Sequence, residues 1–199
     1  MIEPCNQTIG WTQCIGLSLC VWILMGCVAG DRVRLRTGAL YPTLNRTSQC
    51  RVRTPPGPLE RGHVVVITID GVKTTRRITA VAGDRVAMDE GRITLNGTPL
   101  GQRVIKKRVM CRVGVSPKCA CRIAEETLGE RTYRVQHLLP PGVDDDARCE
   151  RQYPDADEQI VSTGHVFVTA DNRDGALDSR TVGPVPVNQI QGRVMSCRY

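Results

Sequence analysis

Residues 170–180 read Ala-Asp-Asn-Arg-Asp-Gly-Ala-Leu-Asp-Ser-Arg, and this stretch lies between two segments with the residue pattern of β-strands. The segment before it, GHVFVT at 164–169, and the segment after it, IQGRVM at 190–195, are short, largely apolar and flanked by glycine or proline. Such short apolar runs between turn-forming residues are typical of strands. We therefore predict that residues 170–180 begin a connection between two strands of one body.

Strand-like patterns also dominate the chain before this stretch. The run HVVVITI at 63–69 and residues 77–86 follow strand periods, with turn-forming residues between them. The run GRITLNG at 91–97 ends in Asn-Gly, a pair that readily adopts positive φ, and this predicts a hairpin. The body is therefore predicted to be mainly β.

The strand pattern weakens over residues 99–162, which contain a Lys-Lys-Arg run at 106–108 and a Pro-Pro-Gly turn at 140–142. We interpret this part as an inserted cap subdomain. The predicted organisation is a membrane anchor at 1–31, a β core in two parts at 32–98 and 163–199, and the cap at 99–162.

Two further segments belong to a pattern of three motifs. Residues 37–44 read TGALYPTL, and residues 76–86 read RRITAVAGDRV. Together with ADNRDGALDSR, and in this order, they resemble the three motifs of signal peptidase I, the S26 family of serine peptidases. The resemblance covers nearly all of the body and implies a signal peptidase-like antiparallel β fold behind a transmembrane helix.

The resemblance also implies that the catalytic residues are substituted. In the family a serine nucleophile is activated by a neutral lysine, whose pKa is depressed by an apolar environment. Ala39 stands at the serine position and has no group that could attack a carbonyl carbon. Arg76 stands at the lysine position, and a guanidinium stays protonated at physiological pH. Ala176 replaces a serine that hydrogen-bonds the lysine in the family, and Ala170 replaces a glycine.

Other elements of the family site are retained. Thr37 keeps a hydroxyl that could contribute to an oxyanion hole beside the backbone N–H of Ala39. The resemblance further implies charged pairs that brace the loop beside the site, formed by Asp171, Arg173, Asp178 and Arg180.

A relocated catalytic pair is an alternative, with Thr43 as nucleophile and Lys73 as base. Thr43 belongs to the ordinary Pro-Thr-Leu turn, and Lys73 precedes Arg76 by three residues, which places it on the opposite face of a regular strand. We therefore do not favour this pair. The three histidines, His63, His137 and His165, are interpreted as surface or packing residues.

The first thirty residues contain an apolar segment. Residues 8–30 carry no charged side chain, and 23 residues in a helix are long enough to cross a hydrocarbon core of about 30 Å. We predict a single spanning helix. A cleaved signal peptide is disfavoured because no Lys or Arg precedes the segment, and a lipidation site at Cys27 is a minority alternative.

The cysteines and the direction of export bear on localisation. Six cysteines lie in the body, at positions 50, 111, 119, 121, 149 and 197, and they are compatible with disulfides whose pairing the sequence leaves open. A zinc site of Cys111, Cys119, Cys121 and Cys149 is the weaker alternative.

The family resemblance implies a plasma (inner) membrane protein whose body lies outside the cytoplasm. Arg32, Arg34 and Arg36 after the span favour the opposite topology.

Composition limits the remaining functions. The chain has 199 residues and a formal charge of +7, but its basic residues are scattered and its aromatic content is 4%. We therefore predict no nucleic-acid partner, and no cofactor or bound metal.

The resemblance implies a membrane protein that binds the signal peptides of exported preproteins and lacks peptidase activity. An active signal-peptide-cleaving endopeptidase with a relocated catalytic pair and a non-enzymatic envelope or lipoprotein module are the alternatives.

Overall fold

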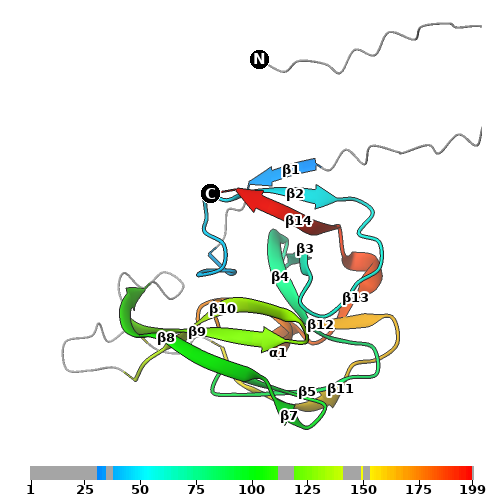
Figure 1. Cartoon of the computed structure of the whole chain (residues 1–199). Helices are drawn as coiled ribbons and strands as arrows, with labels where there is room; N and C mark the ends of the chain where they lie inside the picture. The colour runs from blue at the N-terminus through cyan, green and yellow to red at the C-terminus, as the bar shows by residue number, and fades with distance from the viewer. Residues whose placement is uncertain (1–30, 35–37, 112–118, 141–148, 150–152, 199) are drawn as a thin grey trace, which may run out of the picture.

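A seven-stranded antiparallel sheet forms the largest element of the computed structural model (Figure 1). The structure describes residues 31–34, 38–111, 119–140, 149 and 153–198. In spatial order the strands are β1 (Asp31–Arg34), β2 (Gln49–Arg53), β14 (Gly192–Arg198), β3 (Val64–Ile69), β4 (Val72–Val81), β12 (His165–Thr169) and β13 (Val185–Pro186). Every neighbouring pair in this sheet is antiparallel. Strands from both ends of the described chain are therefore neighbours in one sheet.

Two smaller sheets complete the body. One contains β11 (Ala156–Ile160), β5 (Arg85–Asp89), β6 (Arg92–Leu95) and β7 (Thr98–Pro99), and the other contains β10 (Arg131–Leu138), β9 (Cys119–Leu128) and β8 (Gly101–Cys111). The helices described are a four-residue α1 (Ser179–Val182) and a short 3₁₀ helix η1 (Val187–Gln189). The prediction of a mainly β, antiparallel body is confirmed.

The hairpin predicted from Asn-Gly is also confirmed. Strands β6 and β7 pair through Leu95 and Thr98, which leaves Asn96 and Gly97 as a two-residue turn. Both turn residues have positive φ, at 50° and 78°. This is the backbone that a two-residue hairpin turn of type I′ requires.

The segment in which the strand pattern weakens differs from the expectation. Strands β8, β9 and β10 are 11, 10 and 8 residues long and form an ordered sheet within residues 99–162. Strand β8 is an edge strand on which most side chains are exposed, so it has no apolar alternation to detect. Strand β11, also in this range, pairs with β5 of the preceding part. The subdomain boundaries stay a prediction.

The apolar core has two main clusters. One joins β3, β4 and β12 through Val65, Ile67, Ile78, Val166 and Val168. The other packs Phe167 of β12 against the four-stranded sheet, including Val86, Met88 and Ile93. Side chains of β12 thus enter both clusters, which fixes the position from which the 170–180 segment starts.

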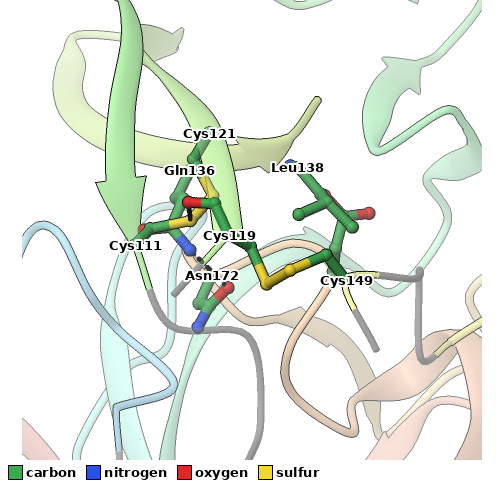
Figure 2. The surroundings of a disulfide bond; sticks show 8 residues. Cys111, Cys119, Cys121, Gln136, Leu138, Cys149 and Asn172 are labelled. Atoms are coloured by element: carbon green, nitrogen blue, oxygen red, sulfur yellow. Dashed lines mark hydrogen bonds between the residues drawn. A yellow bond between two sulfur atoms is a disulfide. The ribbon is translucent and has the colours of Figure 1, made fainter. Parts of the chain in front are cut away.

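The six body cysteines form three disulfides. Cys50 pairs with Cys197 and links β2 to β14, while Cys111 pairs with Cys121 and Cys119 pairs with Cys149. The last two lie side by side in one buried cluster (Figure 2). The four cysteines of the zinc alternative therefore do converge, but as two disulfides. Among the described residues there is no group of three or more side chains placed to hold a metal ion.

The predicted spanning helix lies at residues 8–30, outside the described residues. In the part of the chain that the structure describes, no helix has the length and apolar character needed to cross a membrane. Thr37 also lies outside the described residues, so its predicted hydroxyl contact stays a prediction.

Candidate functional site

The 170–180 segment leaves β12 and returns on itself to enter α1. The backbone N–H of Ala170 donates to Oδ2 of Asp178 at 2.9 Å, which closes the loop. Oδ1 of Asp178 also accepts from the backbone N–H of Arg180 at 3.1 Å and thereby caps α1. The Arg180 guanidinium donates to both oxygens of Asp178, at 2.8 and 3.0 Å. Asp178 and Arg180 are thus a buried pair within this loop.

Three alanines meet where the loop faces the turn at residues 38–41. Ala39, Ala170 and Ala176 are buried and pack together as one cluster. The backbone N–H of Asn172 donates to the carbonyl oxygen of Ala39 at 2.9 Å. Residues separated by more than 130 positions are therefore in contact. The three methyl groups offer no nucleophile, acid or base.

Arg76 of β4 reaches the same loop from the other side. Its Nε donates to the carbonyl oxygen of Leu177 at 2.7 Å, and Nη2 donates to the same oxygen. Nη1 donates to the hydroxyl of Thr74 at 2.6 Å and to the carbonyl oxygen of Thr75 at 2.7 Å. Arg76 therefore lies beside the residue that follows Ala176, and the structure brings Ala39, Arg76 and Asp178 to one segment.

The protonation state of Arg76 follows from this environment. Burial lowers the pKa of Arg76 to about 10, with the nearby charge of Asp178 acting in the opposite direction. That pKa is about three units above neutral pH, so only about one side chain in a thousand is neutral there. Arg76 cannot act as a general base under these conditions.

The alternative pair of Thr43 and Lys73 lacks a catalytic arrangement. The Thr43 hydroxyl donates to the carbonyl oxygen of Arg134 at 2.8 Å, which joins the turn at residues 41–43 to β10. Lys73 is exposed near the start of β4, at the β3–β4 hairpin, whereas Arg76 on the same strand is buried. The Thr43 proton is thus directed to a backbone oxygen.

The histidines differ in environment. His63 accepts a hydrogen bond at Nδ1 from the backbone N–H of Glu60 at 3.0 Å, and burial followed by the charges of Arg193 and Arg131 lowers its pKa. His137 is buried, and His165 contacts the backbone of Thr163. The His63 side chain is 10% exposed, and the interpretation of the three histidines as surface or packing residues stays a prediction.

Asp171 and Arg173 make ion pairs with residues outside the loop. Arg77 of β4 donates to both oxygens of Asp171, at 2.9 and 2.7 Å, and lies 3.8 Å from the ring centroid of Tyr133. Arg173 pairs with Glu126 of β9, and both side chains are 0% exposed. Glu126 and Arg77 were not predicted from the sequence as partners of this loop, and neither was the contact with Tyr133. Glu126 and Tyr133 lie in the part of the sequence that gave no strand signal.

The three-stranded sheet contacts the 170–180 loop through the Arg173–Glu126 pair and through β10. Gln136 of β10 and Asn172 form a parallel backbone bridge, and their side-chain amides also hydrogen-bond at 3.1 Å (Figure 2). The backbone N–H of Leu138 donates to Asp174 at 2.7 Å. The loop is therefore held between β4 and β10.

A pocket of about 330 Å³ lies against the turn at residues 42–43. It is lined by Pro42, Thr43, Glu125, Thr132, Tyr133 and Arg134. Pro42 and Thr43 belong to the turn that begins near Ala39, so the pocket adjoins the alanine cluster along the chain.

A comparison with protein families decides the membership of this chain. The model of the family described as signal peptidase, peptidase S26, matches residues 8–199. The chain belongs to this family. The three motifs on which the resemblance rested therefore lie within one S26 match that also includes the strands between them.

Two individual proteins are similar to this chain in part. A stretch of 36 residues is 53% identical to the mitochondrial ATP-independent inner membrane protease subunit 1b of Arabidopsis thaliana. That stretch covers 18% of this chain and 21% of the relative. A crystal structure of a signal peptidase I from Enterococcus faecalis aligns with a TM-score of 0.39 at 17% identity, over 71% of this chain and 99% of that one.

Proposed function

We propose that this chain is a catalytically inactive signal peptidase homologue that binds exported preproteins at their signal peptides without cleaving them. The observation that carries the proposal is the packing of Ala39 against Ala170 and Ala176 of the 170–180 loop. The cationic Arg76 donates a hydrogen bond to the Leu177 carbonyl oxygen of the same loop. The framework of a peptidase site is retained around residues that cannot perform covalent catalysis.

The retained contacts support binding rather than simple loss of function. Asp171, Arg173 and Asp178 are fully buried and paired, which costs desolvation and needs well-placed partners. The pocket beside the turn at residues 42–43 offers room for side chains of a bound peptide. An ordered loop and a neighbouring pocket are what peptide recognition requires.

A binding measurement tests this proposal. We expect the full-length chain, purified in detergent, to bind a preprotein and to leave it intact over many hours. The mature form of the same preprotein, which lacks only the signal peptide, serves as the control and should bind much more weakly. Equal binding of the two forms, or binding of neither, would contradict the proposal.

We further propose that residues 8–30 anchor the chain as a single span in the plasma (inner) membrane, with the body outside the cytoplasm. The three disulfides support an oxidising compartment, because cytosolic thiols are normally kept reduced. The arginines after the span oppose it under the positive-inside rule.

Thiol labelling in whole cells tests this topology. We expect Cys50, Cys111, Cys119, Cys121, Cys149 and Cys197 to resist a maleimide reagent until a reductant is added. External protease should then digest the body in intact cells. Free thiols at all six positions, together with a protected body, would place the body in the cytoplasm.

A further inference from the structure

The charges around Arg76 do not balance. Asp178 is engaged by Arg180 through both of its carboxylate oxygens. Arg76 donates only to neutral oxygens, those of Leu177, Thr74 and Thr75. Among the described residues, no carboxylate forms an ion pair with Arg76. Within the described ranges, two guanidinium groups thus share one nearby carboxylate, that of Asp178, which is an excess of one positive charge.

Both guanidinium groups also have unused donors. A guanidinium has five N–H groups. Arg76 uses Nε, both N–H groups of Nη1 and one of Nη2, so one Nη2 donor lacks an acceptor among the described residues. Nη1 of Arg180 is buried and has no hydrogen-bond partner within the part of the chain that the structure describes. An unsatisfied buried donor on a cation is costly, and an anionic acceptor would relieve that cost.

The donors left over at this buried site suit a planar anionic acceptor. Arg76 is 5% exposed, and Ala39 is 4% exposed. A carboxylate is planar, matches the donor geometry of a guanidinium and forms charge-assisted hydrogen bonds with it.

We propose that the Arg76 site binds the free α-carboxylate at the C-terminus of a polypeptide, in preference to an internal peptide bond. This rests on the proposed function, since the ligand is again a polypeptide bound at the same site. The arginine then has a role of its own: the site holds a chain that has already been cut, or that ends there naturally, and an intact preprotein gains nothing from Arg76.

Paired peptides test the preference. The probe is a fluorescent apolar peptide that ends in Ala-Gln-Ala, made once with a free C-terminal carboxylate and once as the C-terminal amide. With full-length chain in detergent, we expect the carboxylate form to bind about 10- to 100-fold more tightly, the range that charge-assisted hydrogen bonds provide. Equal affinities would overturn this inference and leave the proposed function standing. Binding of neither peptide would overturn both.

Variants assign the preference to Arg76. Arg76→Gln should abolish the difference between the two peptides, and Arg76→Lys should retain a preference for the carboxylate only at a pH below the lysine pKa, where the amine is charged. Lys73→Gln is the matched control, because it removes one positive charge from the same strand at an exposed position and should change neither affinity. A preference that survives in Arg76→Gln would overturn the inference.

Free anions are the other source of a carboxylate. Sodium acetate at the concentration of the peptide should not displace the carboxylate peptide, because it lacks the contacts of the polypeptide. Displacement by equimolar acetate would show a general anion site and would overturn the assignment to a polypeptide terminus.

Discussion

The double variant Ala39→Ser, Arg76→Lys is expected to cleave a preprotein, whereas the unmodified chain and both single variants are not. Ser at 39 would stand in contact with Ala170 and Ala176, on a turn bonded to Asn172. Without a base it stays a poor nucleophile, because Arg76 has a pKa of about 10 and remains cationic. A positioned general base typically contributes a factor of about 10² to 10⁴ in rate. We expect the second reversion to raise cleavage within that range.

The pH dependence of the double variant distinguishes a lysine base from other routes. The burial that lowers the pKa of Arg76 would also lower that of a lysine in its place. Only the neutral amine accepts the serine proton, so activity should be low in acid and rise as the pH increases through the lysine pKa. Adding Ala176→Ser should increase the rate further if a hydroxyl there orients the amine.

Cleavage by the unmodified chain is the contrary result. If it occurred and were abolished by Thr43→Ala or Lys73→Ala, a relocated pair would replace the inactive-homologue proposal. The bond from the Thr43 hydroxyl to the Arg134 carbonyl and the exposure of Lys73 argue against that outcome.

How much the sequence predicted depends on whether a signal was local. The β character, the Asn96-Gly97 turn and the motif segments are local features, and the structure agrees with them. The disulfide pairing is not local, since Cys50 and Cys197 are 147 positions apart. A single sequence contains no information that selects one of the possible pairings.

Strands β8 to β10 were missed for a different physical reason. Strand β9 contains Glu126 among buried residues, and this charge is tolerated only because Arg173, Tyr133 and Gln102 satisfy it. A buried carboxylate interrupts the apolar pattern that identifies a strand. On β9 the residue that attaches the sheet to the site is therefore also the one that interrupts the apolar pattern, whereas β8 was missed because most of its side chains are exposed.

Removal of the Glu126 carboxylate is expected to destabilise the fold strongly. Glu126 accepts from the Tyr133 hydroxyl at 2.6 Å and from Gln102 at 2.7 Å, and it pairs with Arg173. Burial, followed by the negative charge of Glu126, raises the pKa of Tyr133, so its hydroxyl stays protonated and donates. Glu126→Ala leaves the Arg173 guanidinium, which is 0% exposed, without its counter-charge. Breaking a buried pair in this way costs about 3 to 5 kcal/mol.

The neighbouring residue Glu125 provides a matched control for this prediction. It pairs with Arg103, whose side chain is 77% exposed, and surface pairs of this kind contribute about 1 kcal/mol or less. We therefore expect urea unfolding to show a much lower midpoint for Glu126→Ala than for Glu125→Ala. Replacing both partners, as in Glu126→Leu with Arg173→Met, should recover much of the loss because no charge is then left buried. Equal midpoints for the two single variants would mean that the Glu126–Arg173 pair does not hold the three-stranded sheet to the loop, and the site would need another explanation for its order.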